Sequence, residues 1–344
     1  MKAVVLKKLG NPSVLQVSNV PDPSPPSSNE VTVRIKVAGL NFAETLMRRG
    51  LYQWIPGKKK TGFVLGMEGA GVVEEIGPEV TEFSPGDRVI VGSNSGLYAQ
   101  FVKVPKTQVY PAIESFSFEE NAAFAVSFLT AHVGLEEMAR VRKGETLLIH
   151  AAAGALGTAA VQLGRAFGLE IVGTASTSAK IQFLTNKMSI QAINYQKDDF
   201  KAFVNTWTKG TGVDVILESI GGKVFRDSLS CLAPMGRIIV VGLSSIQFSK
   251  FNPFSWWGAW RTLPRVNILK MLGLSQGIMA FHLGRLLSER YEQLVLAFEK
   301  LRKMVLEYDL RPIIDNIYPL EDATAAHRRL ESRQSIGKVL LEIS

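Results

Sequence analysis

The chain has 344 residues, of which 46% are hydrophobic and 20% are charged. This composition supplies a core for one large or two ordinary domains and excludes a chain that is disordered throughout. A single cysteine, Cys231, excludes a disulfide framework, a four-thiolate zinc site and an iron–sulfur cluster, and it fits a reducing compartment. The net charge of +8 comes from scattered basic residues, so we expect no nucleic-acid partner.

The N-terminal residues MKAVVLKKLG contain an apolar run of only three residues, which does not fit a signal peptide. The stretch 146–164 carries no formal charge, but its glycines and its β-like first half predict a buried strand, turn and helix rather than a membrane span. We therefore expect a cytoplasmic protein.

Residues 1–110 have the pattern of a small β-barrel or sandwich. Apolar and polar residues alternate over 31–37, as is typical of a half-buried strand. Turn-forming residues at 21–26 and 84–87 separate several short strands, and 43–49 predicts a short helix.

From residue 117 the pattern changes to alternating helices and strands. Ser117 and Glu120 fit a capping box at the start of a helix that reaches about residue 140. Short apolar β runs follow at 146–150, 170–174, 214–218 and 237–241, with helical segments between them. This alternation predicts a doubly wound parallel sheet covered on both faces. Residues 285–310 predict a helix, and 338–343 predict a final strand.

Within the segment 147–163, an apolar strand leads into a turn of small residues, and this turn leads directly into a helix. A helix N-terminus exposes unpaired backbone amides, and its dipole favours a pyrophosphate there. Small residues at Ala151, Gly154 and Gly157 would let phosphates approach the turn closely. The predicted phosphate-binding residues are Ala153, Gly154, Ala155, Leu156 and Gly157. A tight strand–helix connection without a ligand is the alternative.

The residues after the next predicted strand favour NADPH over NADH. NAD sites usually carry Asp or Glu about 20 residues after the glycine turn, where it binds the ribose hydroxyls. Here Thr174 is followed by ASTSAK, which contains no carboxylate. The hydroxyl of Ser176 and the ammonium of Lys180 would attract a 2′-phosphate that an acid would repel. A solvated surface lysine is the alternative for Lys180.

Motifs along the whole chain resemble the zinc-free quinone oxidoreductase family of the medium-chain dehydrogenase/reductase superfamily. They are GLNFAET at 39–45, GLY at 50–52, GMEGAG at 66–71, PGDRV at 85–89 and the glycine turn. FHLG at 281–284, RPIID at 311–315 and GKVLL at 337–341 are similar to the vesicle amine transport protein 1 branch.

The resemblance implies an α/β architecture of two domains with the active site in the cleft between them. A GroES-like β-barrel catalytic domain is expected over 1–124 and 283–344. A Rossmann-type NADPH-binding domain is expected over 125–282. The resemblance also implies a homodimer.

The resemblance further predicts that the site holds no zinc. Zinc alcohol dehydrogenases have a cysteine where this chain has Asn41 and a histidine where it has Met67. The histidines of the chain are dispersed, and none forms a ligand pair at helical spacing: His132, His150, His282 and His327.

Without a metal, the expected reaction is hydride transfer to a carbon conjugated with a carbonyl, in a small hydrophobic quinone or enone. By resemblance, Asn41 lies beside the nicotinamide or the substrate, where its amide would orient a carbonyl. Tyr52 is the second candidate, because its phenol can donate a proton. A turn-capping asparagine and a packed tyrosine are the alternatives. Some family members carry a tyrosine where this chain has Leu46, so the proton donor stays open.

The resemblance implies further cofactor contacts. Thr130 would approach the nicotinamide ribose, and Tyr195 would lie near the adenosine phosphate. Ser219 and Gly242 end two strands at the carboxyl edge, where such sheets bind ligands. Lys338 would reach the cofactor, with a surface lysine as the alternative.

Residues 246–285 interleave aromatic and cationic residues and contain no acid. This pattern fits a substrate pocket, a subunit interface or a peripheral membrane contact. The alternative functions are an NADPH-binding, membrane-associated scaffold with little turnover, and an enoyl-thioester reductase.

Overall fold

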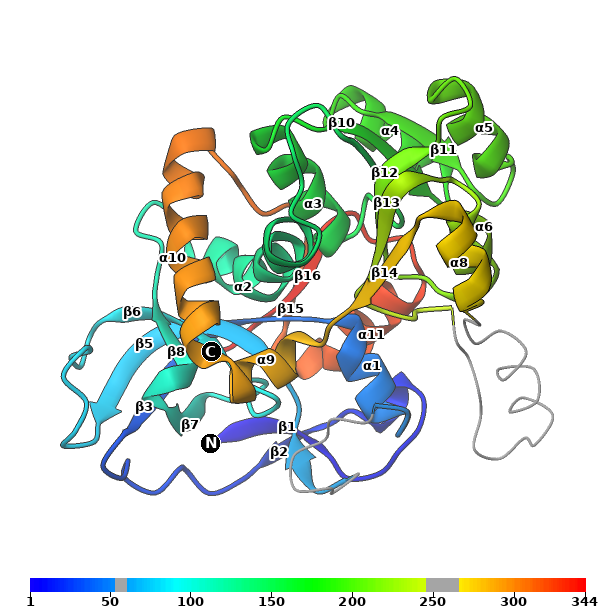
Figure 1. Ribbon diagram of the computed structural model, residues 1–344. Coiled ribbons are helices and arrows are strands. Elements are labelled where there is room, and N and C mark those ends of the chain that lie inside the picture. The colour runs from blue at the N-terminus through cyan, green and yellow to red at the C-terminus, as the bar shows by residue number, and fades with distance from the viewer. Residues whose placement is uncertain (53–60, 246–265) are drawn as a thin grey trace. The chain divides into compact units, whose positions relative to one another are not determined.

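The computed structural model describes residues 1–52, 61–245 and 266–344, which fall into two compact units (Figure 1). The first unit comprises 1–129, 283–305 and 311–344, and the second comprises 130–282 and 306–310.

The first unit is built on a seven-stranded sheet whose order is β15-β16-β3-β5-β6-β8, with β7 also paired to β3. All its pairs are antiparallel except β15 with β16. The strands are β3 (Glu30–Gly39), β5 (Glu68–Ile76), β6 (Arg88–Gly92), β7 (Phe101–Pro105), β8 (Val109–Pro111), β15 (Ile314–Pro319) and β16 (Lys338–Glu342). A smaller sheet joins β2 (Val17–Asn19), β1 (Lys2–Leu6) and β4 (Phe63–Val64).

Strand β3 is central to this unit because both β16 and β5 pair with it. Val31, Val33 and Ile35 are buried in the core and Arg34 is exposed, as the alternation predicts, but Thr32 is buried as well. The helices that belong wholly or mostly to the first unit are α1 (Phe42–Arg48), α2 (Phe118–His132), α9 (Leu283–Glu289), α10 (Tyr291–Tyr308) and α11 (Ala323–Glu331).

The second unit contains a six-stranded sheet in the order β11-β10-β9-β12-β13-β14, in which every pair is parallel (Figure 1). The strands are β9 (Thr146–Ile149), β10 (Glu170–Ala175), β11 (Gln191–Asn194), β12 (Val213–Glu218), β13 (Leu232–Val240) and β14 (Gly277–Ala280). The helices are α3 (Ala155–Ala166), α4 (Ser178–Asn186), α5 (Phe200–Trp207), α6 (Gly222–Leu229) and α8 (Ile268–Leu274). The strand order reverses between β9 and β12, as in doubly wound folds.

The predicted start of α2 is confirmed, but two helices differ from the prediction. Ser117 and Glu120 form the capping box, since each backbone N–H binds the other residue's side chain, at 2.9 and 3.2 Å. The helix ends at His132 and continues as a π-helical segment, Val133–Met138. Residues 285–310 are helical as expected, but they form two helices, since α9 ends at Glu289 and α10 begins two residues later.

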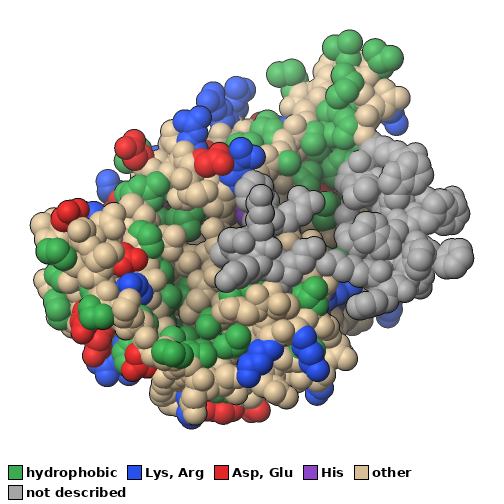
Figure 2. Space-filling model, turned by 90° about the horizontal axis from the view of Figure 1, so that it is seen from below, with side chains coloured by type: hydrophobic (Ala, Val, Ile, Leu, Met, Phe, Trp, Pro, Cys, Tyr) green, Lys and Arg blue, Asp and Glu red, His purple; other side chains and the backbone are tan. Residues whose placement is uncertain are grey.

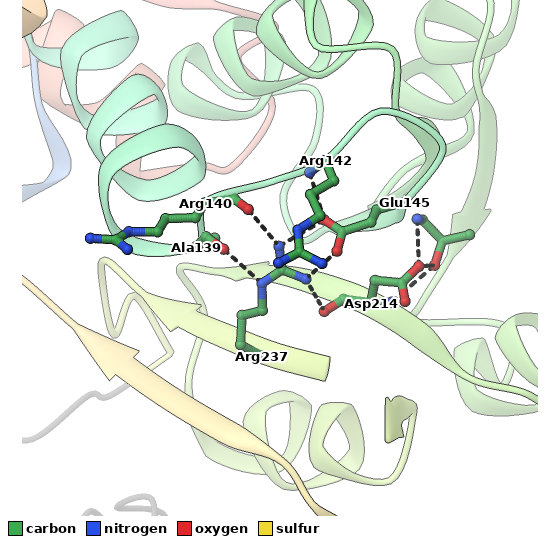
Figure 3. A network of polar contacts seen from close by, with 7 residues as sticks. Ala139, Arg140, Arg142, Glu145, Asp214 and Arg237 are labelled. Atoms are coloured by element: carbon green, nitrogen blue, oxygen red, sulfur yellow. Dashed lines mark hydrogen bonds and ion pairs between the residues drawn. The ribbon is translucent and has the colours of Figure 1, made fainter. Parts of the chain in front are cut away.

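Arg237 holds the segment between the π-helix and β9 against the sheet (Figure 3). Its guanidinium donates to both carboxylate oxygens of Glu145, at 2.9 and 2.7 Å, and to the carbonyl of Ala139 at 2.9 Å. Asp214 accepts from the backbone N–H and the hydroxyl of Thr146, both at 2.8 Å. These contacts fix the beginning of β9, whose other end leads into the glycine turn.

None of the described helices is both long and apolar enough to cross a bilayer. On the face shown in Figure 2, Lys and Arg side chains lie in separate groups, mixed with acidic and apolar ones.

Candidate functional site

The residues predicted to bind the dinucleotide follow the carboxyl ends of the strands in the second unit. Residues 153–157 lie in the turn after β9 and the first turn of α3, Ser176 follows β10, Tyr195 follows β11, Ser219 follows β12 and Gly242 lies just after β13. Because the strands are parallel, these positions share one edge of the sheet. A Cβ on Gly242 would lie 3.3 Å from the carbonyl oxygen of Ser219, so the last two positions are adjacent. Thr130 lies in the last turn of α2 and is half-buried.

The turn after β9 has a backbone that requires small residues. Ala151 is in the left-handed region, with φ of 52°, and its carbonyl accepts from the Gly154 N–H at 2.9 Å. A Cβ on Gly157 would lie 2.5 Å from the carbonyl oxygens of Ala151 and Ala152. The Ala152 N–H donates to the Thr174 carbonyl at 2.9 Å and ties the turn to β10.

The start of α3 fits a pyrophosphate. Its N-cap is Gly154, which provides no side-chain cap, and its first turn contains no acidic residue. The amides of Ala155, Leu156 and Gly157 therefore have neither an intrahelical partner nor a side-chain cap. Such amides, with the positive end of the helix dipole, favour an anion.

The end of β10 fits a 2′-phosphate better than a free ribose hydroxyl. Residues 176–180 contain no carboxylate, and the Thr177 hydroxyl caps α4 by accepting from the Lys180 N–H at 3.3 Å. Ser176 is half-buried, and Lys180 is only 9% exposed. The alternative that Lys180 is a solvated surface lysine is therefore wrong.

His150 and Glu218 form a buried polar cluster that sequence reasoning missed. His150 lies 2.8 Å from Ser228 Oγ and 3.0 Å from Thr174 Oγ1, and burial lowers the pKa of His150 to about 3. Glu218 accepts from the Gly221 N–H at 2.9 Å, and burial raises the pKa of Glu218 to about 7 despite this hydrogen bond. The sequence feature that could have indicated this cluster is Glu218, an acidic residue at the end of the apolar strand β12.

In the first unit, Asn41 is the N-cap of α1 and charged groups hold its carboxamide. Its Nδ2 donates to Glu68 Oε1 at 2.9 Å, and its Oδ1 accepts from Lys338 Nζ at 2.8 Å. Lys338 and Glu68 also form an ion pair with each other, and their exposed fractions are 2% and 0%. The surface-lysine alternative for Lys338 is therefore wrong.

Glu44, which the sequence analysis did not single out, fixes the backbone of Asn41. Its carboxylate accepts from the Asn41 N–H at 2.6 Å, from the Met67 N–H at 2.8 Å and from the Tyr98 hydroxyl at 2.8 Å. Complete burial raises the pKa of Glu44 to about 7, although the hydrogen bonds and Lys338 lower it. Glu44 thus joins the start of α1 to the residue that precedes β5.

Tyr52 follows α1 and packs against the core of the first unit. Burial, and secondly the charge of Glu44, raise the pKa of Tyr52, so its phenol keeps its proton at neutral pH. This placement agrees with a packed tyrosine, and its role as a proton donor stays a prediction.

The residues around Asn41 do not fit a zinc site. The described part of the chain contains no group of three His, Cys, Asp or Glu residues that could hold a metal. Lys338 already supplies a cation to the carboxylate of Glu68.

The segment 246–285 falls partly outside the described residues, which resume at 266. Its described part includes α8, where Ile268, Leu269 and Leu272 are 70%, 80% and 76% exposed.

Comparison with known families identifies both parts of the chain. Residues 27–114 match the alcohol dehydrogenase GroES-like domain, and residues 190–341 match the family described as zinc-binding dehydrogenase.

Relatives resemble the chain over nearly its whole length. The synaptic vesicle membrane protein VAT-1 homolog of Rattus norvegicus is 32% identical, over 99% of this chain and 84% of its own length. The quinone oxidoreductase of Sus scrofa is 30% identical, over 99% of this chain and 97% of its own length. The structure of Escherichia coli quinone oxidoreductase complexed with NADPH has a TM-score of 0.87 and 29% identity, covering 99% of this chain and 100% of its own.

Proposed function

Because the chain belongs to the medium-chain dehydrogenase/reductase superfamily, we propose that it is an NADPH-dependent reductase of quinones or α,β-unsaturated carbonyl compounds. The proposal rests on two neighbouring segments at one edge of the second unit's sheet. The turn after β9 has backbone amides that no side chain caps, and the segment after β10 contains no carboxylate. When bound, NADPH supplies the hydride.

In the second unit, the amides of Ala155, Leu156 and Gly157 bind the pyrophosphate. Ser176 and Lys180 bind the 2′-phosphate, and this contact selects NADPH over NADH. Gly157 keeps the turn compact, since any side chain at that position meets backbone.

In the first unit, Asn41 orients the substrate. Its amide donates to the carbonyl oxygen and stabilises the negative charge that grows there, without changing its own protonation. Tyr52, whose raised pKa keeps the phenol protonated, or solvent supplies the final proton.

The test mixes the purified protein with NADPH and either a naphthoquinone or a medium-chain enone, and follows the absorbance of the reduced nicotinamide. We expect NADPH oxidation that depends on the acceptor. Saturable NADPH binding without turnover on any conjugated acceptor would favour a scaffold instead. Turnover only with an enoyl thioester would point to an enoyl reductase.

A peripheral membrane contact is the second candidate, supported by α8. Its exposed Ile268, Leu269 and Leu272 adjoin Lys270, and the relative named above carries the words vesicle membrane protein in its name. Flotation with anionic vesicles tests this candidate, and Leu269→Ser/Leu272→Ser should abolish flotation. If the unaltered protein does not float with the vesicles, the proposed membrane contact is wrong.

A further inference from the structure

Two charged residues hold the Asn41 carboxamide in one orientation. Lys338 Nζ donates to Asn41 Oδ1, while Asn41 Nδ2 donates to Glu68 Oε1. An ammonium group only donates hydrogen bonds, and an ionised carboxylate only accepts them. A carboxamide turned by 180° would direct its oxygen at the carboxylate and its NH₂ group at the ammonium. The pair therefore excludes that orientation.

Lys338 and Glu68 meet because the strand between them ends in glycine. Lys338 is on β16 and Glu68 on β5, and both strands pair with β3 near Gly39. A Cβ on Gly39 would lie 2.9 Å from Lys338 Cε and 3.0 Å from Glu68 Cγ, and 2.5 Å from the carbonyl oxygen of Ala122. Burial of the pair strengthens its electrostatic contacts, because little water screens them.

One hydrogen of Asn41 Nδ2 remains available for a ligand. Asn41 is half-buried, and within the described residues Glu68 alone accepts from this nitrogen. The backbone of the same residue is fixed separately, since its N–H donates to Glu44 at 2.6 Å. Both the position of Asn41 and the direction of its amide are thus set by buried carboxylates.

We propose that Lys338 and Glu68 are positioning residues, which together present the remaining Nδ2 hydrogen of Asn41 to the carbonyl oxygen of the substrate. The inference rests on the proposed function. It gives Lys338 a role distinct from the direct cofactor contact that the family resemblance implied. An oriented donor at the developing oxyanion accelerates the reaction without necessarily tightening cofactor binding.

The test compares Lys338→Met with the double variant Lys338→Met/Glu68→Gln. The single variant leaves a buried carboxylate without its cation, so we expect a lower Tm. The double variant removes both charges and recovers most of the Tm. The glutamine amide introduced by Glu68→Gln can both donate and accept, so the Asn41 carboxamide loses its fixed orientation. We expect kcat to be at least about tenfold lower in the double variant, because in the single variant the Glu68 carboxylate still accepts from Asn41 Nδ2.

Two further measurements separate positioning from folding and from cofactor binding. NADPH affinity, measured by fluorescence titration, should stay within about twofold of the unaltered protein, a change of less than about 0.5 kcal/mol. The ¹H–¹⁵N signals of the Asn41 side chain, assigned by their loss in Asn41→Asp, should shift, with faster hydrogen exchange. Lys103→Met is the matched control, because it breaks another Lys–Glu pair on the same sheet, with Glu30 at 3.3 Å, and should leave kcat unchanged.

Normal kcat in the double variant would overturn the inference, because the pair would then act only through the fold. A loss of NADPH affinity as large as the loss of kcat would also overturn it, in favour of a cofactor contact. If the unaltered protein reduces no conjugated acceptor, the proposed function fails. Unchanged Asn41 side-chain signals in both variants would then show separately that the pair does not orient the amide.

Discussion

Gly157 and Ala151 approach so closely that no side chain fits between them. A Cβ on Gly157 would lie 2.5 Å from the Ala151 carbonyl oxygen, which also accepts the Gly154 N–H. A Cβ on Gly154 would lie 3.4 Å from the same oxygen, an ordinary contact. The two glycines therefore serve different purposes. Gly157 permits the turn itself, whereas Gly154 leaves space on the outside of the turn.

Alanine substitutions should separate these purposes. Gly157→Ala should lower the free energy of unfolding by about 1–3 kcal/mol, because its methyl group meets backbone. Gly154→Ala should change Tm little but weaken NADPH binding about tenfold, since its methyl group would lie where the phosphates approach. Gly273→Ala, whose Cβ meets nothing within 4 Å, is the control. A Gly154→Ala protein that binds NADPH normally would contradict the proposed phosphate position.

Lys180 should determine the choice of cofactor. Lys180→Ala should weaken NADPH binding about 10–100-fold, because a charge-assisted hydrogen bond to phosphate contributes roughly 1.5–3 kcal/mol. NADH lacks this phosphate, so its affinity should barely change. Lys187→Ala, an exposed lysine that caps the end of α4, should affect neither cofactor. Equal losses for both cofactors in Lys180→Ala would remove Lys180 from the phosphate site.

Glu218 should make stability depend on pH. Its folded pKa of about 7 lies above the ordinary value of 4.5, so its contribution is fully present below pH 4.5 and is lost as the pH rises through 7. The lowered pKa of His150 has the opposite effect, because it makes stability rise with pH between pH 3 and 6.5. His150 is present both in the unaltered protein and in the variant Glu218→Gln, so its effect cancels when the two are compared.

Glu218→Gln stays neutral and keeps an acceptor for the Gly221 N–H. Its stability relative to the unaltered protein should therefore increase between pH 5 and pH 8 by up to about 3 kcal/mol. Urea denaturation at several pH values measures this difference. A difference that does not change with pH would show that Glu218 is ionised throughout.

Arg237 should stabilise the second unit without affecting cofactor selectivity. Arg237→Met removes the bidentate contact with Glu145 and the bond to the Ala139 carbonyl, and should cost about 2–4 kcal/mol in urea denaturation. Lys223→Met breaks the more exposed pair with Asp227 and should change stability little. Similar effects of the two substitutions would contradict the importance of the buried network.

Local sequence patterns were sufficient to predict the parallel sheet and the glycine turn, because each depends on residues close together in the chain. The strands β11 (QAIN) and β14 (GIMA) were missed, since neither is a run of β-branched and leucine residues like TLLI in β9, which has the same length. The environment of Asn41 was also missed. Glu68 and Lys338 are 270 residues apart in sequence, and only the pairing of β16 and β5 with β3 brings them together.

Calorimetric titration of the unaltered protein with NADPH, and separately with NADH, measures whether the chain binds a dinucleotide and which one it prefers. We expect one NADPH bound per chain, at least about tenfold more tightly than NADH, which corresponds to about 1.4 kcal/mol. Absence of saturable NADPH binding, or equal affinity for the two dinucleotides, would contradict this expectation.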